Sequence, residues 1–378
     1  MAYNYRVLSL FANIGVAEAC FKEIGVSVPV ANELEPRRAA LYQRIYPDSE
    51  MICGDITDQI IFSNVISASK KAKVNVVMAT PPCQGMSTAG PKDEEDIRNR
   101  LSLYAFEAIK QLRPKYAIIE NVPEYINTSI VYNGQRRLLT DILQEYLGGY
   151  YHITINLINT EDYGVPQSRE RMIILLTDIS QRREWKIPKK DGIKVTMRDA
   201  IGWIPSIDPL VKDLSASEFA RLFPEYEKRK EAALKISRWN TPPAHVYRQV
   251  LAMQHTPTGH SAFDNPVYKP VKANGDFVRG YHNTYMRQNW DTPAYTVTMD
   301  NRKISSQGNV HPGRPDGVDP NGDMIYSDAR TLTLFELMLI MSIPQDWPIP
   351  PDTPEAFLRR IIGEGIPPLF VKKLFMAI

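Results

Sequence analysis

The chain has 378 residues, of which 45 are Lys or Arg and 43 are Asp or Glu, so its formal net charge is only +2. This length exceeds the size at which single hydrophobic cores usually stop growing, and it predicts one large domain plus one smaller domain. The three cysteines, Cys20, Cys53 and Cys83, lack Cys-x-x-Cys spacing and indicate neither a zinc site nor a disulfide framework. Neither a membrane-spanning apolar stretch nor a signal-peptide pattern is present, so we expect a cytoplasmic protein without membrane contact.

The first 180 residues alternate strand patterns with helix patterns. Strands separated by helices of roughly ten residues are typical of a parallel, doubly wound α/β sheet with helices on both faces. The predicted strands are 7–11, 26–31, 51–53, 74–79, 116–119, 153–158 and 172–176, and the predicted helices are 16–24, 37–45, 103–112 and 136–146.

The pattern changes after residue 185, where prolines become frequent and the strands become short and irregular. One charged helix, at 215–235, stands alone in this region. We therefore predict a first domain at 1–185, a smaller irregular domain at 186–328 and a C-terminal segment at 329–378 that returns to the first domain.

Two helices are predicted in the C-terminal segment. The first covers 331–341, and Thr333 followed by Glu336 predicts a capping box at its start. The second covers 367–377, with a proline at its first turn.

The stretch 74–87 joins a buried strand to a turn. Its Val-rich first part predicts a strand, and Pro81 and Pro82 prevent further pairing. Cys83 follows directly, at the edge of the sheet where ligands of α/β proteins bind. Alone, this stretch favours a buried, inert thiol over a nucleophile.

Acidic side chains follow the second and third predicted strands, next to the turn 11–15 after the first. Glu33 is placed to hold ribose hydroxyls, and Asp55 is placed to accept from an adenine amino group. The turn lacks the full G-x-G-x-x-G pattern, and no ATP-binding P-loop is present. Such acids are also common helix caps, but three strand ends in succession favour a nucleotide-like ligand.

Charged residues follow two later strands as well. Glu120 ends the strand at 116–119, where burial would raise its pKa and allow it to donate a proton. Arg169 and Arg171 project from one face of the next segment. Elsewhere they would form a surface salt-bridge ladder, but beside a Cys and a Glu they form a clamp for an anion or a carbonyl group.

In this order, the motifs resemble those of the C5-cytosine DNA methyltransferases over nearly the whole chain. Pro82-Cys83-Gln84 with Ser87 resembles the nucleophile loop, and Glu120-Asn121-Val122 and Gln167-x-Arg169-x-Arg171 match the next two motifs. The other matching fragments are Phe11 to Gly15, Glu33, Asp55, Arg98 with Leu101, Asp291-x-Pro293-Ala294-x-Thr296, Arg330-x-Leu332-Thr333 with Glu336, and 362–368. The chain departs from the family by having Asn13 in place of Gly and Glu364 in place of Asn.

The resemblance implies S-adenosylmethionine as the cofactor, S-adenosylhomocysteine as its product, and no metal. Cys83 would add to C6 of cytosine, Glu120 would act at N3, and Arg171 would hold O2 with support from Arg169. The implied cofactor contacts are Phe11, Asn13, Gly15, Glu33, Leu34, Asp55, Ile56, Pro82, Leu101, Glu364 and Gly365, and the implied DNA contacts are Gln84, Ser87, Arg98 and Gln167.

The implied substrate is a cytosine flipped out of double-stranded DNA, with the loop 84–99 as a lid and 186–328 as the target-recognition domain. Between 228 and 303 there are twelve Lys or Arg but only five Asp or Glu, which fits a nucleic-acid face and equally a solvated surface. The resemblance implies a monomeric prokaryotic enzyme of a restriction–modification system. It would work in the cytoplasm at the nucleoid, with a cognate restriction endonuclease acting separately.

Three other functions compete with this interpretation. An RNA (tRNA) cytosine-5 methyltransferase would use the same scaffold. A DNA-binding relative could have lost catalysis through Asn13 and Glu364. A nicotinamide-dependent oxidoreductase is disfavoured by the incomplete glycine pattern and by the Pro-Cys-Gln loop.

Overall fold

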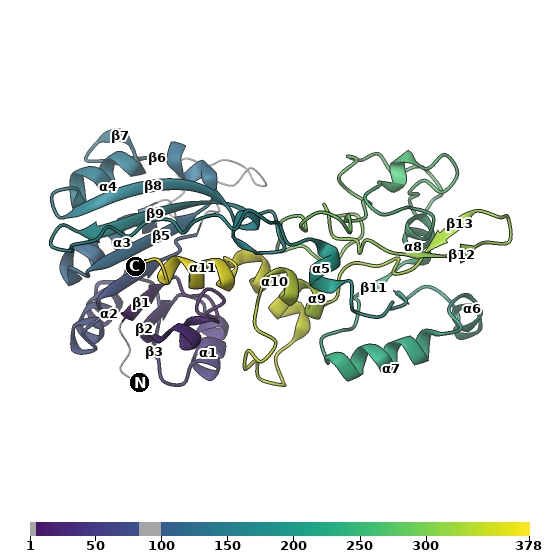
Figure 1. The fold of residues 1–378 in the computed structure, drawn as a ribbon, viewed down its shortest axis with the longest axis horizontal. Coiled ribbons are helices and arrows are strands. Elements are labelled where there is room, and N and C mark those ends of the chain that lie inside the picture. The colour runs from purple at the N-terminus through teal and green to yellow at the C-terminus, as the bar shows by residue number, and fades with distance from the viewer. Residues whose placement is uncertain (1–4, 83–99) are drawn as a thin grey trace.

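The computed structural model describes residues 5–82 and 100–378. Figure 1 shows a larger lobe built around one sheet, a smaller lobe with few strands, and the C-terminal helices running from between the lobes back to the sheet. The strands of the sheet are β1 (Tyr5–Leu10), β2 (Val26–Glu33), β3 (Glu50–Cys53), β4 (Val76–Ala79), β5 (Tyr116–Asn121), β8 (Tyr151–Asn159) and β9 (Glu170–Asp178).

The strand order is β3-β2-β1-β4-β5-β9-β8. The first five strands are parallel, whereas β9 pairs antiparallel with both β5 and β8. The predicted α/β sheet is confirmed, but β9 runs opposite to all the other strands, so β8 and β9 form an antiparallel pair in place of the expected parallel one. Only the short 3-10 helix η4 (Thr160–Tyr163) and a few further residues join them, which is too little chain for a parallel crossover.

Helices cover both faces of the sheet, as predicted. One core lies against α2 (Gln59–Lys71), α3 (Leu101–Leu112) and α4 (Leu139–Leu147), and it includes Leu8 and Leu10. On the other face, Val7 packs with residues of α11 (Pro368–Phe375). Alternate residues of β1 therefore enter opposite cores, as the two-residue period of a strand requires.

Pro29 lies inside β2, which is flanked by β1 and β3, although proline lacks the N–H that an interior strand needs. The pairing of β2 with β1 shifts register at this point: Ser27 faces Arg6, but Val30 faces Leu8. The irregularity absorbs the missing hydrogen bond, so the strand continues past the proline to Glu33.

Three predicted helices differ in the structure. The segment 16–24 forms only the 3-10 helix η1 (Phe21–Ile24), which ends at the left-handed Gly25. The segment 136–146 begins as strand β7 (Gln135–Leu138) of a hairpin with β6 (Ser129–Tyr132) and becomes helical only at α4. The charged helix at 215–235 is two helices, α6 (Ala216–Leu222) and α7 (Tyr226–Ile236), because Pro224 interrupts it.

The smaller lobe has its own apolar core, which includes Val250, Met253 and Tyr285. The domain boundaries at 185 and 328 stay a prediction. The remaining elements of this part of the chain are α5 (Met197–Ile201), β10 (Leu210–Val211), β11 (Ala244–His245), α8 (Tyr247–Gln254), η5 (Ala262–Asp264), β12 (Pro315–Val318) and β13 (Met324–Tyr326).

The C-terminal segment contains α9 (Leu334–Ile340), α10 (Glu355–Glu364) and α11. The predicted capping box is confirmed, since Thr333 N donates to Glu336 Oε2 at 2.7 Å and Glu336 N donates to Thr333 Oγ1 at 3.1 Å. No helix in the described ranges is long and apolar enough to cross a bilayer.

A fully buried ionic network precedes α9. The Arg330 guanidinium donates to Asp328 Oδ1 at 2.7 Å and to both carboxylate oxygens of Glu336 at 2.8 and 2.9 Å. His311 lies beside both carboxylates, and burial lowers its pKa to about 4. The network joins the smaller lobe to the C-terminal helices.

Candidate active site

A cavity of about 960 Å³ lies at the carboxyl ends of the parallel strands. Most of the predicted catalytic and cofactor residues that the structure describes line it, from segments far apart in the chain. Its described lining includes Phe11, Asn13, Glu33, Leu34, Asp55, Ile56, Pro82, Leu101, Glu120, Arg169, Arg171, Glu364 and Gly365.

The turn after β1 is shaped by left-handed backbone conformations. Phe11 has φ 59° and Asn13 has φ 53°. Asn tolerates this region better than other non-glycine residues, which explains how Asn13 occupies a position where the family usually has Gly. Gly15 has φ 80°, and a Cβ there would lie 2.2 Å from the Tyr46 ring. Gly15 therefore shapes the turn, although it is not among the residues that line the cavity.

Glu33 is fixed by its neighbours. One carboxylate oxygen accepts from Asn13 N at 2.8 Å, and the other accepts from Glu35 N at 2.9 Å. Asp55 is more open: its Oδ1 accepts from Thr57 N at 2.9 Å. Both acids line the cavity, as the sequence predicted.

Glu120 and Arg171 form an ion pair at the neighbouring ends of β5 and β9. Arg171 Nε lies 2.8 Å from Glu120 Oε1, and each side chain is 12% exposed. Burial raises the pKa of Glu120, and the charges of Arg171 and Arg169 oppose that shift. A carboxyl group in such a place is suited to hydrogen bonding or proton transfer to a ligand in the cavity.

Arg169 has a different environment from Arg171. It is fully buried, and its guanidinium donates to Val297 O at 2.8 Å and to Gly363 O at 2.9 Å. It therefore connects the segment around Val297 to the C-terminal end of α10. The supporting role that the resemblance implies for Arg169 stays a prediction.

Gln167 is completely buried. Its Nε2 lies 3.0 Å from Met341 Sδ, and its Oε1 accepts from Val297 N at 3.0 Å. The structure therefore offers no exposed atom of this side chain for the predicted DNA contact, and Gln167 instead fixes the backbone beside Arg169.

The nucleophile loop falls mostly outside the described residues. Pro81 O accepts from Asn121 Nδ2 at 3.0 Å, which fixes the path of the chain as it leaves β4. Cys83, Gln84, Ser87, Arg98 and the whole of the proposed lid at 84–99 lie outside the described ranges.

The two positions that depart from the family pattern are in contact. Asn13 Nδ2 donates to Glu364 Oε2 at 3.2 Å. Arg38, in the first turn of α1 (Pro36–Ile45), donates to the same oxygen at 2.7 Å and to Oε1 at 3.1 Å. Arg38 lines the cavity but belongs to none of the sequence motifs. The only sequence signal for it was the negative charge of Glu364, which suggests a cationic partner.

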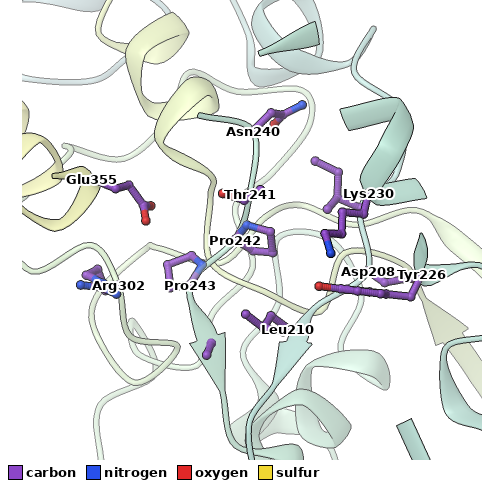
Figure 2. Close-up of a pocket in the computed structure, with 12 residues that line it drawn as sticks. Asp208, Leu210, Tyr226, Lys230, Asn240, Thr241, Pro242, Pro243, Arg302 and Glu355 are labelled. Atoms are coloured by element: carbon purple, nitrogen blue, oxygen red, sulfur yellow. The ribbon is translucent and has the colours of Figure 1, made fainter. Parts of the chain in front are cut away.

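A second cavity, of about 490 Å³, lies between α7 and the start of α10. Figure 2 shows Tyr226, Lys230, the prolines 242 and 243, and Glu355 around it. Its carboxylates already have partners: Asp208 pairs with Arg229 at 2.7 Å and Glu355 with Arg359 at 2.5 Å. Its lining contains neither Cys nor His, so the chemistry is better placed in the first cavity. Within the described ranges, no group of three metal-ligating side chains was found.

The family model for C-5 cytosine-specific DNA methylases matches residues 5–378. The chain belongs to this family. This DNA methylase is 42% identical to the Type II methyltransferase M1.HgaI of Avibacterium volantium, an alignment that covers 99% of this chain and 98% of the relative. It is 24% identical to the Type II methyltransferase M1.HphI of Haemophilus parahaemolyticus, over 98% of this chain and 86% of the relative.

Solved structures share the fold of this methylase. A putative DNA modification methyltransferase encoded within an E. coli prophage aligns with a TM-score of 0.66 at 17% identity, covering 99% of this chain and 98% of that one. Spodoptera frugiperda DNMT2 aligns with a TM-score of 0.60 at 14% identity, over 99% of both chains. The predicted family, fold class and enzyme class are confirmed.

Proposed function

We propose that this DNA methylase transfers the methyl group of S-adenosylmethionine to C5 of a cytosine flipped from a specific duplex sequence, as part of a Type II restriction–modification system. One observation carries the proposal: the Glu120–Arg171 pair opens into the same cavity as Glu33 and Asp55. A base-binding site and a nucleoside-binding site are thereby brought together.

The cavity suits the proposed cofactor. Glu33 and Asp55 lie at successive strand ends, where carboxylates hold ribose and adenine. The Asn13 side-chain oxygen is buried and accepts no hydrogen bond within the described residues, so it is available to a donor group of a ligand. When bound, S-adenosylmethionine supplies an electrophilic methyl group.

The protein's task is to make C5 of cytosine electron-rich. The Cys83 thiolate adds to C6 while Glu120 donates a hydrogen bond or a proton at N3, and the electrons of the C5–C6 bond become available at C5. Arg171 holds O2 of the ring. After methylation, a base such as water removes the C5 proton, and the electrons of that C–H bond re-form the C5–C6 double bond while the C6–S bond breaks and releases the Cys83 thiolate.

Replacing Glu120 with Gln is expected to lower kcat by about 10²–10⁴-fold, the usual contribution of a positioned acid or base. Burial favours the protonated form of wild-type Glu120. The contribution of Glu120 to the rate of methyl transfer should therefore increase as the pH falls toward its raised pKa. That pH dependence should vanish in the variant. Single-turnover methyl transfer measured across pH tests this prediction.

Glu145→Gln is the matched control, since Glu145 forms an ion pair with Arg137 at 2.5 Å but is 59% exposed on α4. If Glu120→Gln kept near-normal turnover and the same pH profile as the control, Glu120 would have no role in catalysis.

The partner is DNA, and we propose that the smaller lobe holds it. Within the described residues, seven of the twelve basic side chains between 228 and 303 already bind carboxylates or backbone carbonyls. Among the residues that the structure describes, no such partner is seen for the other five, Arg248, Lys269, Lys272, Arg279 and Arg302.

Three of these five cations lie at one turn, 270–278: Lys269 and Arg279 are on either side of it, and Lys272 is within it. Lys272 N donates to Asp276 O and Val278 N donates to Pro270 O, so 270–278 folds back on itself. Exposed rings of Phe277 and Tyr281 accompany the cations. Cations mixed with exposed aromatic rings fit phosphate and base contacts better than a merely solvated loop does.

Changing both Lys272 and Arg279 to Ala is expected to weaken DNA binding and to flatten its salt dependence by about 0.9 per lost phosphate contact, on a log–log plot. Changing both Lys228 and Lys235 to Ala is the control, since both residues are exposed on α7 and already paired with Glu. Fluorescence anisotropy at several salt concentrations measures both slopes. Equal slopes in the two double variants would exclude this loop from the interface.

Bisulfite sequencing of DNA from cells that express the protein tests the proposed function directly. We expect protected cytosines at one short recurring sequence. A second assay offers the protein a tritium-labelled methyl donor with plasmid DNA or with tRNA. Labelling of the tRNA alone would favour the RNA alternative. The family match makes this outcome disfavoured. Absence of S-adenosylmethionine binding at millimolar concentration would favour the impaired relative.

The cellular setting is part of the same proposal. We propose a monomeric enzyme that acts in the cytoplasm at the nucleoid, with a separate cognate endonuclease; the Type II relative at 42% identity supports only the restriction–modification setting.

A further inference from the structure

A second group of cations lies at the amino ends of the parallel strands, the opposite end of the sheet from the cavity. It comes from the end of α2 with the loop before β4, from the loop between α3 and β5, and from the segment after β9. Its exposed members are Lys70, Lys71, Lys73, Lys115, Arg182 and Arg183. We call these six residues the basic edge.

The three segments form one continuous surface. The strands β4, β5 and β9 are consecutive in the sheet. Where they meet this edge, Tyr116 N donates to Asn75 O at 3.4 Å and Asp178 N donates to Lys115 O at 3.0 Å. Since neighbouring strands are about 4.8 Å apart, the basic edge is about 10 Å wide before the length of its side chains is added.

The charge of the basic edge is not neutralised by the described part of the chain. None of its six cations forms an ion pair there, and the two carboxylates of these segments have other partners. Asp178 pairs with Arg113 at 3.3 Å, and Glu184 lies 3.9 Å from Lys186. Mutual repulsion makes such a cluster unfavourable for the folded protein, and a polyanion would relieve it.

The backbone gives a second, independent indication. Lys73 has φ 53°, and Arg113, in the neighbouring loop, has φ 49°. Glycine adopts this left-handed conformation at lower cost, so the two turns by themselves favour Gly over a cation. Arg113 is also held in place, since its guanidinium lies 4.2 Å from the centre of the Tyr150 ring. A role for the positive charge explains these two residues, whereas turn geometry does not.

We propose that the basic edge binds the phosphate backbone of a second segment of duplex DNA, distinct from the segment that reaches the cavity. Duplex DNA carries one negative charge per about 1.7 Å, so about 10 Å of it presents about six charges to the six cations. The strand β5 has six residues, which separates the basic edge from the cavity by about 20 Å. The two surfaces face opposite ways, so one straight duplex cannot contact both.

Duplex DNA fits this surface better than an acidic protein does. Protein interfaces usually have an apolar centre. The large apolar side chains exposed in the described parts of these segments and of the adjoining turn before β8 are only Tyr150 and Ile179. Lysine and arginine without an apolar centre are typical of contacts to phosphate, which position DNA without reading its sequence. The basic edge would therefore hold the methylase on long DNA irrespective of sequence.

The number of duplexes bound per chain tests the proposal. Full-length protein is mixed at low salt with an excess of a fluorescein-labelled 20-base-pair duplex, and sedimentation velocity gives the composition of the complex. We expect two duplexes on the wild type and one on the triple variant Lys73→Gly, Lys115→Ala, Arg182→Ala. The salt dependence of the weaker binding step should also flatten by about 0.9 for each lost phosphate contact, on a log–log plot. Lys73→Gly suits the left-handed turn, so the urea midpoint should hardly change.

A second triple variant removes the same net charge elsewhere. Lys190, Lys194 and Lys235 are paired with carboxylates at 2.7, 2.6 and 2.8 Å, and their joint replacement by Ala should leave two duplexes bound. A single duplex on the wild type, or the same stoichiometry in both triple variants, would overturn the proposal. Binding of polyglutamate in place of the second duplex would assign the basic edge to an acidic protein instead. The measurement needs neither cofactor nor turnover, so its failure is distinguishable from failure of the proposed function.

Discussion

Changing Cys83 to Ala is expected to abolish methyl transfer and the covalent complex with DNA that contains 5-fluorocytosine. Without the thiolate, no group adds to C6, so C5 never becomes electron-rich enough to take the methyl group. Fluorine at C5 cannot leave as a proton does, so a competent wild-type enzyme should remain attached to the DNA. Denaturing electrophoresis of labelled DNA detects this complex.

The other two cysteines provide the comparison. Burial raises the pKa of Cys20 to about 11, and burial together with Glu33 and Glu35 raises the pKa of Cys53. Neither is therefore suited to act as a thiolate at neutral pH. Cys53→Ala, at the exposed end of β3, should keep both turnover and trapping. A covalent complex that persists in Cys83→Ala would refute the assigned nucleophile.

Arg330→Met is expected to destabilise the protein by about 3–5 kcal/mol, the usual cost of removing one partner from a buried ionic group. Asp328 and Glu336 would lose a guanidinium that now makes three hydrogen bonds to them, while both stay fully buried. Urea denaturation should show a lower midpoint.

The same network predicts acid sensitivity. Burial alone would raise the pKa values of Asp328 and Glu336, but the neighbouring His311 and Arg330 hold both below their ordinary values. A carboxyl group with a lowered folded-state pKa stabilises the protein above its unfolded pKa and loses that contribution as pH falls. The stability difference between wild type and Arg330→Met should therefore shrink below about pH 4.

Arg198→Met serves as the control for Arg330→Met. Arg198 pairs with Asp291 at 2.8 Å, but its side chain is 59% exposed. Its removal should hardly move the midpoint, as expected for a surface pair. A similar small shift in Arg330→Met would show that the buried network is not important for stability.

The sequence predicted the parts of the site that local chemistry determines. Glu33, Asp55 and Glu120 each follow an apolar strand, so their convergence at one edge of the sheet could be expected from strand order alone. Arg38 could not be found in this way, because its partner Glu364 lies 326 residues further along the chain. The burial of Gln167 was equally hidden, since a short polar motif gives no sign of what later packs over it.

The errors in the fold have similar causes. The helices α2 and α10 were not predicted, and α10 follows a proline-rich passage that suggested only loop. The helical periodicity of 215–235 led to the prediction of one helix, although Pro224 divides it into α6 and α7. The antiparallel β8 and β9 have the same apolar composition as parallel strands, and only the short connection between them determines their direction.

Arg169 has a consequence for exchanging recognition specificity between such enzymes. Its guanidinium binds Val297 O and Gly363 O, and residues 294–297 also hydrogen-bond to Pro166 and Ser168. Part of the predicted target-recognition domain is therefore also part of the wall of the cavity proposed to be catalytic. A chimera that imports a foreign recognition segment should keep residues 294–299 from the same parent as Arg169, since a junction after them would pair an imported wall with a native arginine.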